Sequence, residues 1–280
     1  MLKEEYLVYT NENGESLYFG YNYDLIIPTG EFADEVDNDI ATSKFALQNG
    51  STFNSSALSE RTISFKAIYA ISKAKDIEAK IRKVMNPTIK GTFYKYTSAD
   101  HKKIEVRLEG TPIITRELGL GAVEINMIAL NPFYEITKKT EILAKETPLL
   151  HFPINFIEDN VFGTRVTQIE TSIQNNGDVE TGFVCIFTAR DSVTNPSIIN
   201  NITGERIVLK CEMEKDDVIQ VINLPYNKMI VKNGTKDFSL LNIEETTFFN
   251  LLVGKNALGI DADENLTNLE SRVEFTPLYL

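Results

Sequence analysis

Short runs in which apolar and polar residues alternate, separated by Gly, Asn, Asp and Pro, recur along most of the chain. A period of two places the apolar residues of a strand on one face, so such runs predict sheets with one buried face. Residues 63–69 and 104–108 alternate in this way, and the segment from 111 to 130 reads as two strands that fold back at Gly119 and Gly121. The sequence therefore predicts a mainly β protein.

One segment departs from this pattern. Residues 71–85 carry apolar side chains at the three- and four-residue spacing that lines one face of a helix, and Asn86-Pro87 follows as a stop signal. Three bases, Lys73, Lys80 and Lys83, fall on the opposite face. We expect one amphipathic helix packed on a sheet, which makes the first domain α+β.

The second half continues with short strands, which favours a β-sandwich. Residues 183–187 are apolar at both parities, as in a strand covered on both faces. Residues 229–232, then Asn233-Gly234, then 235–241 are the strongest hairpin signal in the chain. A polar-rich segment ending at Pro148 separates the halves. The predicted domains are therefore 1–145 and 146–280.

Residues 39–59 are rich in Ser, Asn and Thr and contain only isolated apolar side chains. Loops of this length are uncommon in compact domains and tend to be functional or disordered. Two interpretations remain open: a mobile surface loop, or an arm of two strands around Asn49-Gly50 that orders against a neighbouring subunit. On such an arm, Phe45, Leu47 and Phe53 are candidate contact residues.

Charge is distributed unevenly. Residues 4–39 hold ten acidic and no basic residues, whereas residues 61–107 hold twelve basic and four acidic ones. The two regions either neutralise each other within one domain or meet across a head-to-tail contact between subunits. In the second case the interface includes Lys73, Lys80, Arg82 and Lys83, and reversing the last three to Glu weakens self-association more than folding.

Nothing in the sequence nominates catalytic or cofactor-binding residues. There is no G-x-S-x-G, P-loop or G-x-G-x-x-G motif, and neither His101 nor His151 lies near a nucleophile-like Ser or Cys. Cys185 and Cys211 lie in apolar strand-like runs and are expected to be buried, reduced thiols. We therefore expect no enzymatic activity and no cofactor.

The sequence also predicts no metal site, no specific binding of nucleic acid and no insertion into a membrane. Residues 261–265 begin like a calcium loop, but Leu266 and Arg272 replace the glycine and the bidentate glutamate that the loop needs. The net charge of −12 repels phosphate, which argues against nucleic acid as a specific partner. No run approaches the roughly 18 apolar residues that predict a membrane-spanning helix, so membrane insertion is not expected.

Several short motifs follow one another in a definite order. The first half contains Arg61-x-Ile63-x-Phe65, the helix, Asn86-Pro87 and a strand ending Ala129-Leu130-Asn131-Pro132-Phe133. The second contains Asn176-Gly177-Asp178, Asn195-Pro196 and Phe248-Phe249 followed by Gly254 and Asn256. In their order and spacing, over nearly the whole chain, these motifs resemble the distal tail proteins of long-tailed phages.

The resemblance implies a tail-tube-like first domain, a β-sheet or half-barrel with an arm near 39–59, that assembles into a hexameric ring. It implies a galectin-like or carbohydrate-module-like sandwich as the second domain. The protein would be a structural hub at the virion tail tip, made in the cytoplasm of a bacterial host. Its partners would be further copies of itself, the tail tube protein, a tail-tip protein that often carries a lytic activity, and a receptor-binding protein.

The alternative function is a carbohydrate-binding or adhesion protein that recognises host cell-wall polysaccharide through the C-terminal sandwich. Galectin sugar sites use a stacked tryptophan, and this chain has no Trp. The two functions differ in a simple observable. A ring hub has a mass near six times that of the chain, whereas a sugar-binding protein can remain a single chain.

Overall fold

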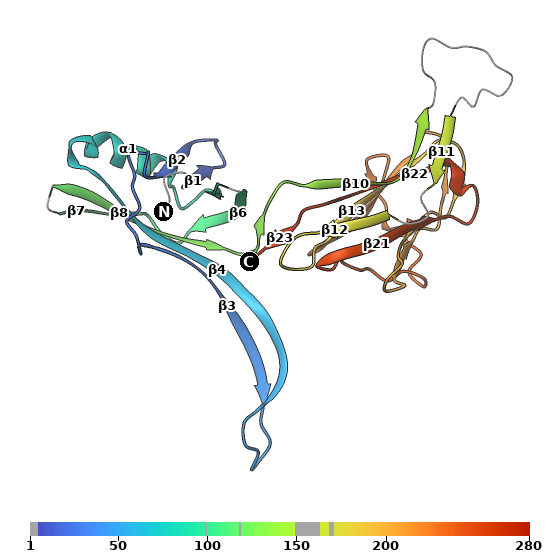
Figure 1. Ribbon diagram of the computed structural model, residues 1–280, viewed down its shortest axis with the longest axis horizontal. Coiled ribbons are helices and arrows are strands. Elements are labelled where there is room, and N and C mark those ends of the chain that lie inside the picture. The colour runs from blue at the N-terminus through green and yellow to red at the C-terminus, as the bar shows by residue number, and fades with distance from the viewer. Residues whose placement is uncertain (1–4, 99, 118, 149–162, 168–170) are drawn as a thin grey trace, which may run out of the picture. The chain divides into compact units, whose positions relative to one another are not determined.

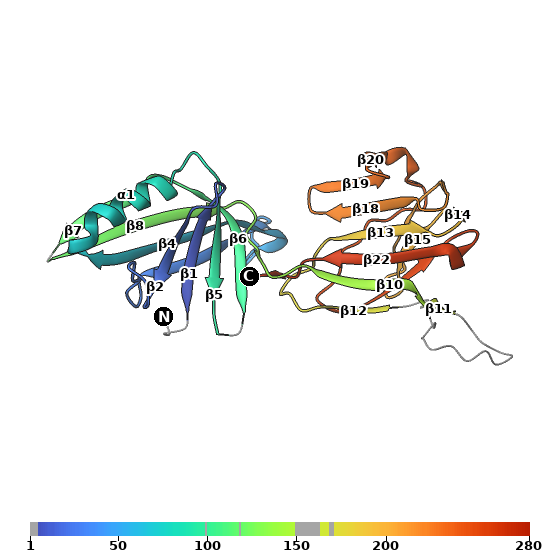
Figure 2. The same ribbon diagram turned by 90° about the horizontal axis from the view of Figure 1, so that it is seen from above.

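The computed structural model describes residues 5–98, 100–117, 119–148, 163–167 and 171–280. Contacts divide the chain into two compact units, Met1–Ile136 together with Leu280 (unit 1) and Thr137–Tyr279 (unit 2). Each unit is built mainly from antiparallel strands, which confirms the predicted fold class (Figures 1 and 2). None of the helices formed by the described residues is long and apolar enough to cross a bilayer.

Unit 1 is an antiparallel sheet with a single α-helix among its described residues. Its elements are β1 (Tyr6–Asn11), β2 (Ser16–Gly20), β3 (Phe32–Ser43), β4 (Thr52–Ala70), a 3₁₀ turn (Ile71–Lys73), α1 (Ala74–Val84), β5 (Gly91–Tyr96), β6 (His101–Leu108), β7 (Ile113–Glu117), β8 (Leu120–Ala129) and β9 (Tyr134–Glu135). The strand order is β2-β1-β5-β6-β8-β4-β3, with β7 on β8 and β9 on β6.

One face of this sheet buries the side chains that the alternation predicted. Ile63, Phe65, Ala67 and Tyr69 of β4 are buried, as are Ile104, Val106 and Leu108 of β6. The predicted fold-back between β7 and β8 is also present, with Gly119 at a φ of 83° that favours glycine. Strand periodicity therefore located the core of unit 1 correctly.

The predicted helix is α1, preceded by the 3₁₀ turn and ending just before Asn86-Pro87. It buries Ala74, Ile77, Ile81 and Val84, as the helical spacing requires. This burial confirms the amphipathic helix.

A carboxylate on α1 is buried together with the apolar residues. The hydroxyl of Tyr69 donates to Glu78 Oε1 at 3.0 Å, and Arg116 donates to both carboxylate oxygens at 2.9 Å. A Cβ on Gly121 would lie 2.2 Å from a ring carbon of Tyr69, so glycine is needed there to admit the ring. Glu78 therefore joins α1 to β4 and β7 through a small polar cluster.

We expect Glu78→Gln to lower the pKa of Tyr69. Burial and the neighbouring Glu78 carboxylate raise this pKa to about 12, because both disfavour the phenolate. Removing the negative charge leaves burial, which raises this pKa, opposed by the positive charges of Arg116 and Arg82, which lower it. An NMR titration of the tyrosine ring carbons, assigned with Tyr69→Phe, measures the shift, and an unchanged pKa would contradict the proposed coupling.

Unit 2 consists of two sheets and a short ribbon. Its elements are β10 (Lys139–Pro148), β11 (Gly163–Thr167), β12 (Thr171–Asn175), β13 (Phe183–Ala189), β14 (Val193–Thr194), β15 (Ser197–Asn200), β16 (Arg206–Val208), β17 (Glu212–Met213), β18 (Val218–Leu224), β19 (Asn227–Lys232), β20 (Thr235–Lys236), a 3₁₀ turn (Phe238–Leu240), β21 (Gly254–Asp261), a second 3₁₀ turn (Leu266–Asn268), β22 (Leu269–Phe275) and β23 (Leu278–Tyr279).

The larger sheet has the order β11-β10-β22-β13-β18-β19-β20, the smaller has the order β12-β21-β15-β16, and β14 pairs with β17. A single core joins the two sheets, with Phe183, Phe187 and Val273 from the first and Ile198, Leu258 and Ile260 from the second. Buried side chains from both sheets in one cluster are what a face-to-face sandwich produces. Unit 2 is the predicted β-sandwich.

The predicted hairpin around Asn233-Gly234 is β19–β20, and both turn residues have positive φ, 49° and 81°. Its second strand is shorter than residues 235–241 suggested. Asp237 accepts a hydrogen bond from Ser239 N at 3.0 Å and starts the 3₁₀ turn Phe238–Leu240. A local side-chain cap therefore ends the strand.

The two units divide at residues 136 and 137, nine residues before the boundary predicted at 145. The segment from 137 to 145 is polar-rich, which favoured a linker, but Lys139–Pro148 forms β10 and pairs with β22. In β10 the exposed Ile142 neighbours Leu143, which is buried in the core. A strand with one solvated face holds many polar residues, and composition alone did not distinguish it from a linker.

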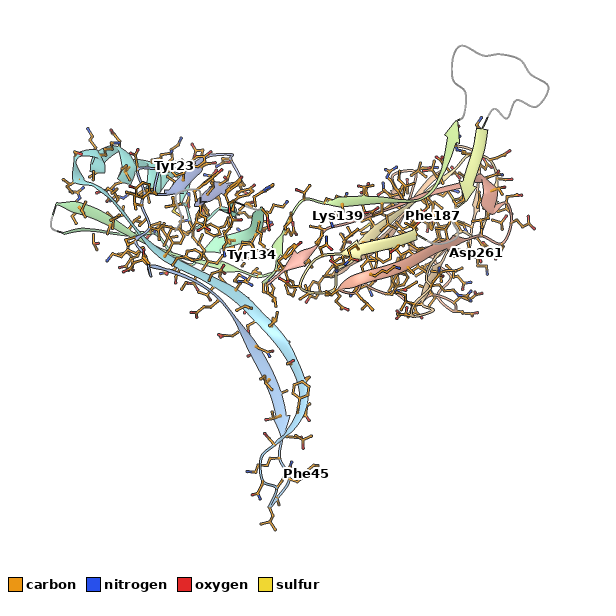
Figure 3. The ribbon with its side chains drawn as sticks, viewed as in Figure 1. Tyr23, Phe45, Tyr134, Lys139, Phe187 and Asp261 are labelled. Carbon is orange, nitrogen blue, oxygen red and sulfur yellow. The ribbon has the colours of Figure 1, made fainter. Side chains whose placement is uncertain are left out.

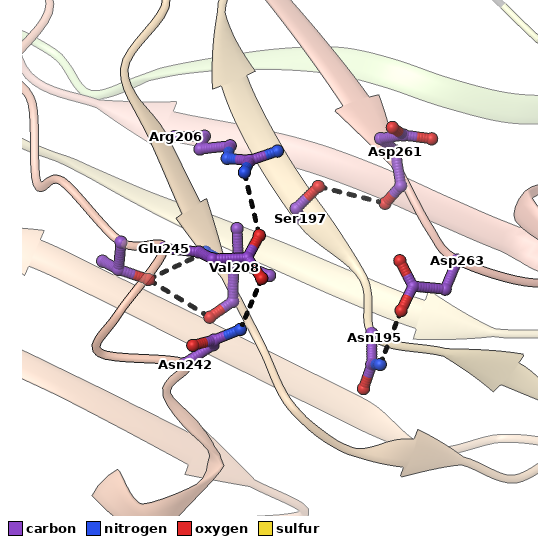
Figure 4. A network of polar contacts seen from close by, with 9 residues as sticks. Asn195, Ser197, Arg206, Val208, Asn242, Glu245, Asp261 and Asp263 are labelled. Carbon is purple, nitrogen blue, oxygen red and sulfur yellow. Dashed lines mark hydrogen bonds and ion pairs between the residues drawn. The ribbon is translucent and has the colours of Figure 1, made fainter.

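Figure 4 shows how loops cover one edge of the smaller sheet. Thr246 exchanges hydrogen bonds with the backbone of Val208, and Arg206 pairs with Glu245 at 2.8 Å. Asn195, at a φ of 51°, donates to Asp263 Oδ2 at 2.7 Å. These contacts satisfy an edge strand that would otherwise expose unpaired backbone groups.

Candidate assembly interface

Residues 38–58 form a two-stranded ribbon, which we call the arm. β3 pairs with β4 from Phe32 to Ser43, but β8 pairs with β4 only from Arg61 onward. Beyond that point the ribbon leaves the sheet and curves away from the body of unit 1 (Figure 1). Gly50 has a φ of 78° in the connecting turn. Of the two interpretations of residues 39–59, the two-stranded arm is therefore confirmed at the level of its fold.

The register of the arm shifts twice, between Val36 and Asn38 and between Ala41 and Thr42. Each shift adds one residue to β4. At each shift, therefore, the odd-numbered and even-numbered side chains of β4 exchange faces. Directly opposed residues share a face of the ribbon, and every second residue of β3 lies on the same face. One face therefore carries the pairs Asn38↔Leu58, Ile40↔Ser56 and Thr42↔Phe53. Without the second shift, Phe53 would lie on the other face from Leu58.

That face of the arm carries three exposed apolar side chains among the polar Asn38, Thr42 and Ser56. Ile40, Leu58 and Phe53 are 58%, 37% and 63% exposed. The same face continues into unit 1, where Phe32 pairs with Phe65 in the core. An apolar sheet face that extends beyond its own core is typical of a protein contact surface.

The tip of the arm carries the other two predicted contact residues. Phe45 is 73% exposed at the end of the ribbon (Figure 3). Leu47 is fully exposed. The structure therefore places Phe45, Leu47 and Phe53 all on the arm. It adds Ile40 and Leu58, which sequence reasoning missed because their alignment with Phe53 depends on the second register shift.

A buried ion cluster holds the root of the arm. Asp34 on β3 accepts hydrogen bonds from Arg61 Nη1 at 2.7 Å, Lys95 Nζ at 2.7 Å and the hydroxyl of Tyr134 at 2.9 Å. Arg61 Nε also donates to the carbonyl of Pro132 at 2.6 Å. Two motifs identified in the sequence, the one beginning at Arg61 and the one containing Pro132, therefore meet at this cluster.

Burial raises the pKa of Asp34, but the hydrogen bonds and charges of Lys95 and Arg61 outweigh burial and hold this pKa below its ordinary value. The side chains of Arg61 and Asp34 are 5% and 9% exposed.

One sequence signal points to this cluster. Arg61 lies two and four residues before the buried Ile63 and Phe65, so the alternation of the strand places it on the same buried face. A buried arginine requires a partner.

Most of the basic contact residues predicted on the helix and on the 3₁₀ turn before it pair within unit 1. Lys73 pairs with Asp24 at 2.6 Å, Lys83 pairs with Glu15, and Arg82 lies 3.9 Å from Glu78. The pairs with Asp24 and Glu15 join the acidic region to the basic one and favour neutralisation within one domain. Lys80 lines a shallow cavity of about 130 Å³ with Tyr23 and Ile77. In Figure 1 the arm leads away from α1, so the two sets of predicted contact residues form separate surfaces.

Sequence reasoning missed a group of stacked tyrosines on the face of the sheet opposite the core. The rings of Tyr6 and Tyr96 stack with centroids 4.5 Å apart, and Tyr23 and Tyr94 continue the group at 5.5 and 6.2 Å. His101 stacks on Tyr96 at 5.7 Å. Tyrosines at matching parity on β1 and β5 are the sequence signal. Such rigid aromatic surfaces are enriched in protein interfaces.

The cysteines and histidines considered as candidates for chemistry differ in burial. Cys185 is buried, and burial raises the pKa of its thiol to about 12, whereas Cys211 is only partly buried. His101 is exposed, and His151 lies outside the described residues. In the described part of the chain, no group of three or more His, Cys, Asp or Glu is placed to hold a metal ion.

Residues 176–279 match the family model of the siphovirus-type tail component, C-terminal domain. The whole chain has the fold of SPP1 Dit, whose crystal structure is described as a paradigm of the hub adsorption apparatus in phages infecting Gram-positive bacteria. The TM-score is 0.71, with 12% identity over 98% of this chain and 99% of that one. These findings confirm the resemblance to phage distal tail proteins.

Two structures of the phage p2 baseplate in its activated conformation, with Sr and with Ca, also match. They are 13% and 14% identical to this chain, with TM-scores of 0.42 and 0.43, and each match covers 96% of this chain and 97% of the other. The search of curated proteins returned no match.

Proposed function

We propose that this chain, which has the fold of a phage tail hub protein and carries a siphovirus-type tail component domain, forms a hexameric ring at the distal end of a phage tail. In this role it is a structural subunit and not an enzyme. The arm carries the proposal. It presents an apolar face, Ile40, Phe53 and Leu58, that nothing in the described part of its own chain covers.

A head-to-tail contact between the arm of one copy and unit 1 of the next joins two different surfaces. Such heterologous contacts close into rings when the rotation between subunits allows it. Three of the four predicted basic contact residues, Lys73, Arg82 and Lys83, are paired within unit 1, so the arm carries more of this contact than these charges. Lys80 is the α1 base that we retain as a contact residue.

The ring joins the tail tube to the tail-tip protein and to receptor-binding parts, and it occupies the tail tip of a virion assembled in the bacterial cytoplasm. The fold shared with SPP1 Dit supports this placement. Unit 2 is the galectin-like module of the hub. Because the chain has no Trp, sugar recognition is the weaker of the two functions considered for this unit.

Mass in solution tests the ring. We expect light scattering and electron microscopy of the purified chain at high concentration to show particles of about six times 31.6 kDa with a central opening. A single-chain mass at every concentration, together with retention on cell-wall polysaccharide, would favour the adhesion function instead.

A further inference from the structure

A cavity of about 470 Å³ lies in unit 1 where β6 changes its neighbour in the sheet. β6 pairs with β8 at Arg107 and with β9 at Lys103. The segment 130–133 crosses between these two pairings, and Arg61 Nε holds the carbonyl of Pro132 at 2.6 Å. The crossing leaves a hollow beside β6 whose volume is typical of ligand sites.

Apolar side chains form part of the cavity wall. Ile128, Leu130 and Phe133 line it, and Leu130 is 70% exposed. The N–H of Phe133 donates to Asn131 Oδ1 at 3.4 Å, which shapes the crossing segment. Leu130, Asn131 and Phe133 belong to the motif that ends the first half of the chain. The motif therefore builds this cavity as well as meeting the Asp34 cluster.

The charged side chains of the lining are three cations and two carboxylates. Lys90 pairs with Glu105 at 3.3 Å, and Lys103 pairs with Glu135 at 3.6 Å. The third cation is Arg107, which is partly buried. Within the described part of the chain, no carboxylate pairs with Arg107. Its guanidinium is therefore available to a negative group from outside the chain.

These charges select the kind of anion. A guanidinium binds a carboxylate or a phosphate through two parallel hydrogen bonds. A phosphate monoester carries a charge of about −1.5 to −2 at neutral pH. Glu105 and Glu135 also line the cavity and would repel the second negative charge. A singly charged carboxylate therefore fits better than a phosphate.

The apolar wall requires an apolar group close to that carboxylate. The C-terminal residue of a polypeptide meets both requirements, because its carboxylate and its side chain are attached to the same carbon atom. Capture of a C-terminal carboxylate is a recurring mode of peptide recognition. One such residue can place its carboxylate on Arg107 and its side chain against Leu130 and Phe133.

Other cavities of unit 1 suit a carboxylate less well. In the cavity of about 250 Å³ beside Phe32, the cation is Lys95, which is already paired with Asp34 at 2.7 Å. The cavity along β3 and β4 measures about 330 Å³ and is lined by two carboxylates, Glu31 and Glu124, and one cation, Lys66. A net negative lining repels a carboxylate.

We infer that the cavity beside Arg107 binds the C-terminal residue of a partner polypeptide that ends in an apolar side chain. The site is separate from the arm, because its residues lie next to or on β5, β6, β8 and β9. The inference goes beyond the proposed ring and does not depend on it.

Saturation-transfer NMR on the purified full-length chain tests the inference, since the method detects weak ligands of large particles. The probes are the peptide N-acetyl-Gly-Gly-Leu with a free carboxylate, the same peptide as its C-terminal amide, and N-acetyl-Gly-Asp-Leu amide. We expect the free acid to bind at least about tenfold more tightly than its amide, because a hydrogen-bonded charge is lost in the amide.

Equal affinity for the acid and its amide, or no binding of the acid, would overturn the inference. Equal affinity for the acid and the Asp peptide would assign the site to an acidic side chain in place of a chain terminus, which also overturns it. In competition, inorganic phosphate should displace the acid no better than acetate does. Preferential displacement by phosphate would contradict the choice of anion.

Variants locate the binding. Arg107→Gln should weaken binding of the acid about tenfold or more and leave binding of the amide unchanged. Leu130→Ala should weaken both peptides several-fold. The matched control is Lys66→Gln, which removes one positive charge from a different cavity and should bind the acid as the parent chain does. Equal losses in Arg107→Gln and Lys66→Gln would show that net charge, and not this cavity, is responsible.

Light scattering on the same samples separates this site from the ring. The particle mass should be the same for Arg107→Gln and the parent chain. A lower mass would assign the cavity to a contact between copies and would overturn the inference. A parent chain that stays single but binds the acid through Arg107 would contradict the ring and support the site. If Arg107→Gln does not fold, the comparison of acid with amide on the parent chain still decides.

Discussion

Charging the apolar face of the arm should reduce the assembled particle to single chains. The variant is Ile40→Asp combined with Phe53→Asp, which places two carboxylates where we propose that apolar side chains are buried against a neighbour. Each buried apolar side chain contributes about 1.5–3 kcal/mol. A loss of about 3–6 kcal/mol per contact is more than about a hundredfold in association. Light scattering measures the change in mass.

The opposite face of the same ribbon supplies the control. Ala41 pairs with Ser55, and both are exposed, so Ala41→Asp with Ser55→Asp introduces the same charge on the other face. We expect this variant to assemble normally. Melting temperatures of both variants should stay close to that of the parent chain, because exposed substitutions usually change stability by about 0.5 kcal/mol or less. Equal loss of assembly in both variants would show that charge, and not the apolar face, decides the result.

Asp34→Ala should destabilise unit 1 by about 3–5 kcal/mol, because it leaves the buried guanidinium of Arg61 without its carboxylate. The hydroxyl of Tyr134 loses its acceptor in the same variant. Urea unfolding followed by tyrosine fluorescence measures the change. The control is Asp24→Ala, which breaks the exposed pair with Lys73 and should cost at most about 1 kcal/mol. Similar losses in the two variants would contradict the role of the buried cluster.

The same pair predicts a dependence on pH. The folded-state pKa of Asp34 lies below its unfolded value of about 3.9, so the pair contributes its full stability above that value. The contribution is lost as pH falls through the folded-state pKa, where the carboxylate takes up a proton. We therefore expect the stability difference between the parent chain and Asp34→Ala to be constant near neutral pH and to shrink in acid. A difference that grows in acid would have the wrong sign.

Predictions that rest on local periodicity agree with the structure. The inward residues of β4 and β6, the buried face of α1 and the Asn233-Gly234 turn all follow from side-chain spacing within a few residues. The β10 segment shows where this method fails. Its polar residues lie on a strand whose place in the sheet depends on pairing with β22, more than 120 residues further along the chain.

The residues of the candidate interface were likewise predicted only in part from the sequence. The residue types on the arm nominated Phe45, Leu47 and Phe53, and the order of motifs along the chain indicated the family. The register shift between Ala41 and Thr42 was needed to bring Ile40 and Leu58 onto the same face as Phe53. Arg61 was visible as a motif residue, but its partner Asp34 is 27 positions away and is set by strand pairing.

Sequence alone therefore determined the strand and helix faces and the resemblance to phage tail proteins, and it gave the arm as one of two interpretations of residues 39–59. Tertiary structure decided between the loop and the arm, and it also decided which charges pair within unit 1 and which side of the arm carries its exposed apolar side chains. The physical reason is that periodicity and turn chemistry act between near neighbours in the chain, whereas register and ion pairing join residues that only the folded sheet brings together.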